Sequence, residues 1–122
     1  MDWSFGDAGT KYFNFRLSDA KEGIVYIALI NKQIAGYLAG GLIKIRPWRK
    51  EKRAVEIENM YVTKSKRKLG IGTAFVAKFI KWAKKNAVDR LKVEAVYENT
   101  IGRNFYEKHG LKEYSVIYEC DI

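Results

Sequence analysis

Two apolar runs in the first third of the chain predict a β-hairpin. Residues Ile24–Ile30 are continuously apolar and include β-branched and aromatic side chains, which are typical of a strand. A second strand is predicted at Ile34–Ile45, and the dipeptide Asn31-Lys32 between the two runs has the composition of a turn. Residues 1–23 show no clear period of their own.

Strict alternation marks the next strand, Ala54–Val62. One face of this strand carries Val55, Ile57 and Tyr61. The opposite face carries Glu56, Glu58, Met60 and Val62. The pattern predicts a half-buried strand whose second face holds two carboxylates, two residues apart.

The pattern changes to a helical period after this strand. Apolar residues at helical spacing run from Thr73 to Ala87, with lysines on the other side, and an alternating strand follows at Leu91–Val96. A strand, a turn with two glycines, a helix and a strand make a right-handed βαβ unit with parallel strands. We then expect a short helix at Ile101–Lys108 that ends at Gly110, and one strand or two kinked strands at Leu111–Ile122.

These elements predict a single α/β domain with mixed strand pairing. A length of 122 residues with 48% hydrophobic residues suits one domain with one core. No window is long and uncharged enough to span a membrane, and the first residues do not resemble a secretory signal, so we expect a cytoplasmic protein. The single cysteine, Cys120, excludes an internal disulfide and argues against a cysteine-based metal site, so we expect no metal.

Positive charge is concentrated in the middle of the chain. The net charge is +9, from 23 Lys and Arg against 14 Asp and Glu. Residues 44–92 hold 16 basic and 4 acidic residues, whereas the remainder holds 7 and 10. This distribution favours a polyanionic partner, either nucleic acid or a multiply phosphorylated small molecule, although lysines that only keep the surface soluble give the same composition.

The turn before the long helix has the composition of a phosphate site. Gly70 and Gly72 lack a Cβ, so a ligand can approach the backbone closely. The amides that follow belong to a helix N-terminus, where unpaired N–H groups and the helix dipole favour an anion. The basic residues in the same corner are Lys64, Lys66, Arg67 and Lys68. A plain tight turn is the alternative, because neither the P-loop nor the dinucleotide-binding pattern is present.

Two motifs in and after this turn resemble the signature of the GNAT superfamily of N-acetyltransferases. The first is Arg67-x-x-Gly70-x-Gly72, which follows the strand sequence Glu58-Asn59-Met60-Tyr61-Val62. The second is Asn99-x-x-Gly102-x-x-Phe105-Tyr106-x-x-x-Gly110-Leu111, in which Gly102 stands where the family usually has alanine. The resemblance covers residues 24–122.

The resemblance implies a mixed, mostly antiparallel sheet with a central, splayed pair of parallel strands and helices on both faces. It makes residues 1–122 one acetyltransferase domain, with a reduced N-terminal region at 1–23 and a CoA-binding core at 24–122. The family's opening strand and two helices, which form much of its acceptor pocket, have no full counterpart in residues 1–23. A homodimer whose second subunit completes the site is one explanation, beside a naturally minimal chain and a chain that lacks part of its N-terminus.

The resemblance also assigns the binding of acetyl-CoA to particular residues. The backbone of Met60, Tyr61 and Val62 would pair with the pantetheine arm as an added strand does. The amides that would hold the pyrophosphate belong to Arg67, Lys68, Leu69, Gly70, Ile71, Gly72 and Thr73. Asn99 would contact the pantetheine, with a helix cap as the alternative role, and Arg103 is interpreted as a surface charge rather than a phosphate ligand. Tyr106 would approach the thioester sulfur.

Three side chains are candidates for the catalytic groups. The reaction needs a base, because an amine with a pKa near 10.4 is protonated at pH 7. Glu56 and Glu58 occupy positions where members of the family have a catalytic glutamate, and Glu56 is slightly preferred; pairing with nearby lysines is the alternative for each. Tyr106 is the predicted general acid, because a phenol is neutral at pH 7, and an aromatic wall is its alternative role. The single histidine, His109, lies at a helix end and is interpreted as a cap or surface residue.

The sequence thus predicts an enzyme that moves an acetyl group from acetyl-CoA to a primary amine. Direct attack is favoured, because no Ser-His-Asp or Cys-His set is arranged for an acyl-enzyme. Two alternatives stay open: a CoA-binding module without turnover, and a basic nucleic-acid-binding domain. The second alternative is the weaker, because Trp48 is the only aromatic residue interleaved with the charges of the stretch Lys44–Lys68. The acceptor is left open between a protein N-terminus, a lysine side chain and a small amine, and the basic loop Arg46–Arg53 slightly favours acidic peptides.

Overall fold

The computed structural model describes residues 2–5, 10–15, 23–44 and 53–122. The strands of these residues are β1 (Asp2–Phe5), β2 (Thr10–Phe15), β3 (Gly23–Ile30), β4 (Gln33–Lys44), β5 (Arg53–Val62) and β6 (Leu91–Val93). The helices are the short 3₁₀ helix η1 (Lys64–Lys66) and the α-helices α1 (Ile71–Lys85) and α2 (Thr100–Lys108). None of the helices in these ranges is long and apolar enough to cross a membrane.

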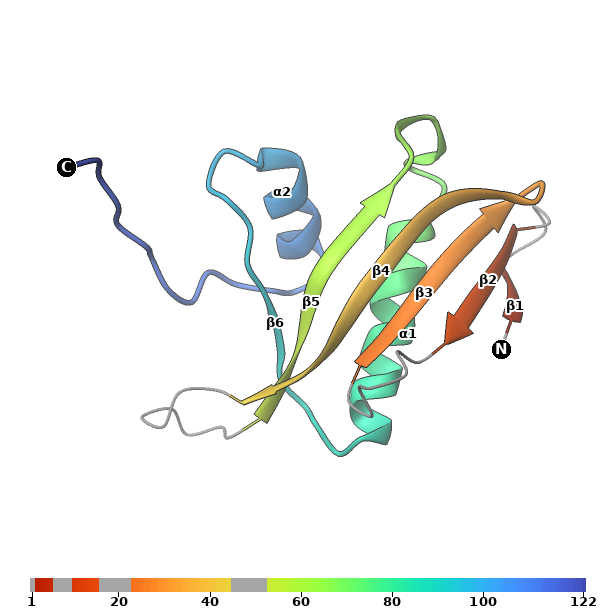
Figure 1. The fold of residues 1–122 in the computed structure, drawn as a ribbon, viewed down its shortest axis with the longest axis horizontal. Helices are drawn as coiled ribbons and strands as arrows, with labels where there is room; N and C mark the ends of the chain where they lie inside the picture. Colours follow the sequence, from red (N-terminus) through yellow and green to blue (C-terminus); the bar gives the residue numbers. More distant parts are fainter. Residues whose placement is uncertain (1, 6–9, 16–22, 45–52) are drawn as a thin grey trace.

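The strands join one sheet in the order β1-β2-β3-β4-β5-β6 (Figure 1). Neighbouring strands are antiparallel except β5 and β6, which are parallel and are connected through α1. The predicted mixed, mostly antiparallel sheet is therefore confirmed. The predicted hairpin of β3 and β4 is confirmed as well: Asn31 and Lys32 both have positive φ, 51° and 65°, as a two-residue type I′ turn requires.

Part of the region before Ile24 extends this sheet. β1 pairs with β2, and β2 pairs with β3 so that Phe13 lies opposite Ile27. The two short runs are rich in aromatic residues, which favour strands, but each is too short for its period to be visible in the sequence. The described residues before β3 therefore contribute an antiparallel ribbon.

The core lies between α1 and one face of the sheet, with α1 behind β3 and β4 in Figure 1. Phe75 and Phe79 of α1 are fully buried against Leu38 of β4. Glycine at position 40 of β4 allows this packing, because a Cβ there would meet the carbonyl oxygen of Glu56 on β5 and would lie 2.7 Å from Cζ of Phe79. We expected helices on both faces; in the described part of the chain, no helix lies over the opposite face of β3 and β4 (Figure 1).

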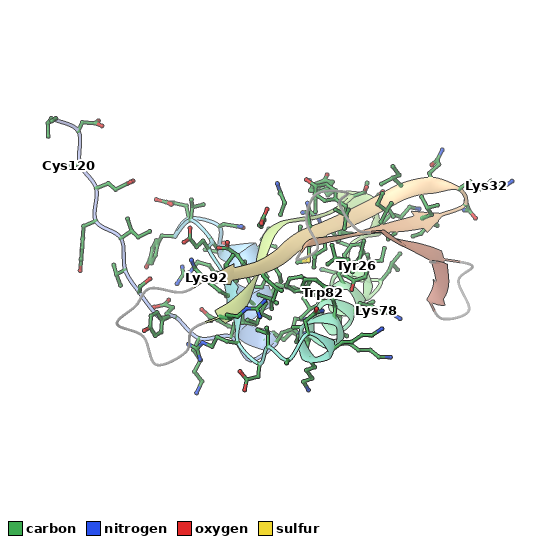
Figure 2. The ribbon with its side chains drawn as sticks, turned by 60° about the horizontal axis from the view of Figure 1, so that its bottom comes forward. Tyr26, Lys32, Lys78, Trp82, Lys92 and Cys120 are labelled. Atoms are coloured by element: carbon green, nitrogen blue, oxygen red, sulfur yellow. The ribbon has the colours of Figure 1, made fainter. Side chains whose placement is uncertain are left out.

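Polar and aromatic contacts also hold α1 against the sheet. The hydroxyl of Tyr26 in β3 donates a hydrogen bond to the carbonyl of Lys78 at 3.2 Å, and burial raises the pKa of Tyr26 to about 12. Trp82 stacks on Phe79 with ring centroids 5.7 Å apart. Tyr26, Lys78 and Trp82 lie close together where the sheet meets α1 (Figure 2). The helix is thus attached to β3 as well as packed on β4.

The prediction of a strand at Leu111–Ile122 is wrong for the single chain. These residues contain no strand, and from Lys112 onward every one of them is exposed. The segment runs away from the domain and ends far from it (Figures 1 and 2). Because it is not in the sheet, the parallel pair of β5 and β6 lies at the edge of the described sheet, whereas we expected it at the centre.

The contact between Gly40 and Phe79 leads to a stability prediction. We expect Gly40→Ala to lower the free energy of unfolding by about 1–3 kcal/mol, because the added methyl overpacks a filled core. Ala39→Val is the control, since Ala39 is the next residue on the opposite, half-buried face of β4 and should change stability by about 0.5 kcal/mol or less. Urea denaturation measures both. Equal stabilities of the two variants would contradict the close packing of β5 and α1 around Gly40.

Candidate functional site

β5 contains a bulge at Glu58. Ala39 of β4 lies opposite Asn59, whereas its neighbour Gly40 lies opposite Ile57. Two residues of β5 therefore occupy the span of one residue of β4, and Glu58 is the extra residue. A bulge of this kind redirects the side chains on either side of it, and here it lies between two candidate catalytic glutamates.

The bulge reverses the faces of the second half of β5. Met60 and Val62 pack against the core on the same side as Ile57, and Tyr61 is exposed. We predicted that Tyr61 would share the face of Ile57 and that Met60 and Val62 would share the face of the glutamates. That prediction was wrong, because one extra residue exchanges the two faces of a pattern with a period of two.

β5 and β6 stop pairing directly before Glu58, the extra residue of the bulge. Their ladder contains three residue pairs and ends where Ile57 lies opposite Val93. Beyond this pair a cavity of about 180 Å³ opens between the strands and α2. The residues that line the cavity are Ile57, Glu58, Asn59, Met60, Val93, Glu94, Ala95, Asn99 and Tyr106. The expected divergence of the two parallel strands is thus confirmed.

The two candidate glutamates have different surroundings. Glu56 lies beside the ladder, and its Oε2 is 3.5 Å from Nζ of Lys92 on β6. The same ammonium is 3.1 Å from Oε1 of Glu94, and these two carboxylates, Glu94 foremost, raise the pKa of Lys92. Glu58 is exposed and lines the cavity, and it makes no ion pair with another described residue. Glu58 is therefore the glutamate that a molecule in the cavity would meet.

Tyr106 enters the cavity from α2. Its side chain is half-buried and packs against the core, and its ring meets that of Phe105 edge-on with the centroids 5.4 Å apart. Burial raises the pKa of Tyr106 above its ordinary value, so the phenol keeps its proton throughout the neutral range. Glu58 and Tyr106 thus bring a carboxylate and a proton donor to one cavity from two different elements.

Asn99 has both of the roles considered for it. It is the N-cap residue of α2, where its Oδ1 accepts a hydrogen bond from the amide of Gly102 at 3.0 Å. It also lines the cavity next to Tyr106. A Cβ at position 102 would lie 2.5 Å from Nδ2 of Asn99, so the glycine at this position makes room for the capping side chain.

The turn between β5 and α1 exposes a row of backbone amides. Lys68 and Gly70 have positive φ, 66° and 87°, and Gly70 is the N-cap residue of α1. No described group accepts a hydrogen bond from the amides of residues 68–73, the last three of which form the first turn of α1. The residues around the turn are basic and include no acid in the first turn of the helix. The turn has the geometry of an anion site at a helix N-terminus.

Each of the two glycines in this turn is required for a different structural reason. Gly70 supplies the left-handed conformation that starts the helix. Gly72 makes room for α2, because a Cβ there would lie 3.1 Å from Cζ of Phe105. Oγ1 of Thr73 is 3.2 Å from Nε2 of His109, so the C-terminal end of α2 contacts the first turn of α1. The N-terminal end of α2 borders the cavity through its N-cap residue, Asn99.

Two arginines considered for phosphate binding have structural contacts instead. Nε of Arg67 donates to the carbonyl of Val62 at 2.9 Å, and its guanidinium lies over the ring of Tyr61 at 5.6 Å. Arg103 donates to the carbonyl of Tyr97 at 3.0 Å and to Oε1 of Glu113 at 2.9 Å. Arg67 therefore binds the last residue of β5. Arg103 connects α2 to the segment before it and to the segment after it.

Several lining residues were missed in the sequence. Asn59, Glu94 and Ala95 border the cavity, but only the bulge and the end of the ladder direct them there. Glu94 did show one signal, since it continues the alternation of β6 on the side opposite Val93. Nothing in the local pattern indicates where two strands stop pairing.

Comparison with known proteins gives one family. The model of the acetyltransferase (GNAT) family matches residues 1–111. No curated protein sequence matches the chain.

Solved structures with this fold include an aminoglycoside N-acetyltransferase in complex with CoA, which is 19% identical with a TM-score of 0.75 and covers 84% of this chain and 78% of its own. An aminoglycoside 6'-N-acetyltransferase from Acinetobacter haemolyticus is 19% identical with a TM-score of 0.72, covering 84% of this chain and 72% of its own. A variant of the BH1408 protein from Bacillus halodurans is 20% identical with a TM-score of 0.76, covering 85% and 69%.

Proposed function

The chain belongs to the acetyltransferase (GNAT) family and uses acetyl-CoA, and we propose that it moves the acetyl group to a primary amine by direct attack on the thioester. One observation carries this proposal: Glu58 and Tyr106 line the same cavity between the splayed strands β5 and β6. When bound, acetyl-CoA supplies an activated acetyl group as a thioester. The residues around the cavity bind it, orient it and move two protons.

The splayed strands suit the pantetheine arm. β5 continues from Asn59 to Val62 in register with β4, while its other side has no strand partner beyond Ile57 among the described residues. An extended ligand can therefore add to this open side as a strand would, with the backbone of Met60, Tyr61 and Val62 as its partner. The cavity lies along the same side of the strand.

The turn between β5 and α1 suits the pyrophosphate. It begins directly after Val62, where the proposed pantetheine site ends. Its exposed amides from Lys68 to Thr73 and the dipole of α1 favour negative charge. The basic residues around it add a positive field, so the open side of β5 is followed along the chain by an anion site.

Glu58 is proposed as the base, in place of the slight preference for Glu56. The carboxylate of Glu56 is engaged by Lys92, whereas the carboxylate of Glu58 faces the cavity. Glu58 accepts a proton from the attacking ammonium, directly or through a water molecule. The neutral nitrogen then forms a bond to the acetyl carbon as the bond from that carbon to sulfur breaks, and the nitrogen releases its second proton to solvent.

Tyr106 is proposed as the acid. Its raised pKa keeps the phenol protonated, and it reaches the cavity from α2, whereas Glu58 reaches it from β5. Tyr106 gives its proton to the departing sulfur and regains one from solvent, so the products are an acetamide and the free thiol. The proposed acceptor is a primary amine of unspecified class. The slight preference for acidic peptides came from the basic loop at residues 46–53, and of these only Arg53 is among the described residues.

The anion site gives a prediction for CoA binding. Leu69 is 58% exposed within the turn, so Leu69→Glu adds a negative charge without disturbing the core. We expect CoA affinity to fall roughly five- to tenfold, because the carboxylate repels the pyrophosphate by about 1 kcal/mol or more. Leu69→Gln has nearly the same shape without the charge and should bind within about twofold of the parent. Isothermal titration calorimetry compares the three proteins, and equal affinities of the Glu and Gln variants would move the phosphate site elsewhere.

The assignment of the base predicts unequal effects for the two glutamates. We expect Glu58→Gln to lower kcat/KM by about 10²- to 10⁴-fold and to remove the acid limb of its pH profile. Glu56→Gln loses only an ion pair with Lys92, so its kcat/KM should stay within a few-fold of the parent. Thiol release from acetyl-CoA, followed against pH with a panel of amines, measures both. A large loss in Glu56→Gln with none in Glu58→Gln would exchange the two roles.

The assignment of the acid predicts a loss of kcat without a loss of affinity. Tyr106→Phe keeps the ring and removes the hydroxyl, so we expect kcat to fall about 10²-fold or more. CoA affinity should hardly change. Burial raises the pKa of Tyr106 from its ordinary value of 10.0. The parent enzyme should therefore keep this proton, and its activity, until the pH rises above that value. If Tyr106→Phe keeps its kcat and Tyr106→Ala loses CoA affinity, Tyr106 is an aromatic wall.

A further inference from the structure

His109, the single histidine of the chain, is held between two helices. Its Nε2 lies 3.2 Å from Oγ1 of Thr73 in the first turn of α1. On its own helix, its ring and that of Phe105 meet edge-on with the centroids 4.4 Å apart. The proposed acetyl transfer uses neither the imidazole of His109 nor the hydroxyl of Thr73. Both groups nevertheless lie at the end of α1 that the anion site occupies.

The contact between His109 and Thr73 adds little to the attachment of α2. Phe105 already packs against the core and against α1, where a Cβ at Gly72 would lie 3.1 Å from its Cζ. Thr73 is exposed and His109 is half-buried. A hydrogen bond between groups that water can also reach contributes little to stability. The contact does, however, restrict the orientation of the Thr73 hydroxyl, which would otherwise rotate freely.

Thr73 brings two hydrogen-bond donors to the anion site. It is the third residue of α1, and no described group accepts a hydrogen bond from its amide. Among the described residues, its hydroxyl forms a hydrogen bond only with His109. The free amides of a first turn and the helix dipole favour a phosphate at this position. The hydroxyl can therefore add a donor to the row of amides, provided that its hydrogen points outward.

A phosphate in this position selects the direction of the hydrogen bond between the two side chains. Phosphate oxygens accept hydrogen bonds, so the Thr73 hydroxyl has to donate its one hydrogen to the phosphate. Its oxygen can still accept a hydrogen bond, and His109 supplies one in the form that carries a proton on Nε2. The opposite direction, from the hydroxyl to Nε2, would leave no hydrogen for the phosphate. His109 can thus hold the hydroxyl in the orientation that a phosphate requires.

We propose that His109 is a positioning residue for the pyrophosphate of CoA. Nε2–H of His109 donates to Oγ1 of Thr73, and the Thr73 hydroxyl donates to a pyrophosphate oxygen. The inference rests on the proposed function, because that function brings the pyrophosphate to the first turn of α1. The imidazole acts through Thr73 and does not touch the ligand. A hydrogen bond to a charged oxygen is stronger than one between neutral groups, and a hydroxyl that is already oriented loses less entropy on binding.

Matched variants test the hydroxyl and the imidazole separately. Thr73→Val keeps the shape and removes the hydroxyl, so we expect CoA affinity to fall about tenfold. Thr73→Ser keeps the hydroxyl and should bind CoA within about threefold of the parent. We expect His109→Leu to lose roughly three- to tenfold in affinity, and His109→Gln to recover most of it, since its amide nitrogen can donate in place of Nε2–H. Isothermal titration calorimetry measures all four, and parental affinity in His109→Leu would overturn the proposal.

A double variant and shortened ligands distinguish positioning from a purely structural role. Because His109 acts through Thr73, adding His109→Leu to Thr73→Val should cause no further loss of CoA affinity. The loss in His109→Leu should persist with dephospho-CoA, which keeps the pyrophosphate, and should be absent with pantetheine, which lacks it. NMR titration measures the weak binding of pantetheine. Multiplied losses in the double variant, an equal loss with pantetheine, or no loss with dephospho-CoA would each contradict the assignment.

The affinity of the parent separates this inference from the proposed function. A parent that binds no CoA would overturn both the CoA site and the role of His109. A parent that binds CoA, with variants that bind it equally well, would overturn only the role of His109. Urea denaturation of each variant shows whether the fold is kept, and Thr73→Val should match the parent because Thr73 is exposed.

Discussion

The short ladder between β5 and β6 is the constraint on which the site depends. Three pairs hold the two strands together, and the pairing stops at Ile57 and Val93. Had it continued, the backbone groups of Met60 to Val62 would be used within the protein. Because it stops, β5 keeps an open side directly before the turn that leads into α1. The opening, the anion site and the catalytic candidates therefore lie in sequence along one strand and one turn.

The bulge at Glu58 decides how the carboxylates of β5 are used. Without it, Glu56 and Glu58 would point the same way from a regular strand. The extra residue separates them: Glu56 lies beside the ladder and forms an ion pair with Lys92, and Glu58 lines the cavity. The same extra residue returns Met60 and Val62 to the core. A single irregularity thus allows one strand to pack α1 at both ends and to expose a carboxylate in its middle.

Glycines set the distances between the layers. Gly40 allows Phe79 of α1 to approach β4, and Gly72 allows Phe105 of α2 to approach α1. The second contact positions Tyr106, the neighbour of Phe105, at the cavity. Gly72 therefore matters for the position of a candidate catalytic group as well as for the backbone around a phosphate. Among the described residues, β6 pairs with β5 alone, so this strand is the least supported part of the cavity.

Features that depend on neighbours along the chain could be predicted from the sequence. Periodicity located β3, β4, α1 and α2, and the dipeptide Asn31-Lys32 located the hairpin turn. The two motifs identified the family and drew attention to Asn99 and Tyr106, which line the cavity. The tertiary structure alone decided what depends on pairing between distant residues. The bulge exists because Gly40 pairs with Ile57 and Ala39 with Asn59. Which glutamate faces the cavity follows from that register and from Lys92 on β6. Residues 111–122 were predicted to be a strand, yet they contain none in the structure, because a strand needs a sheet edge to pair with, and no local pattern contains that information.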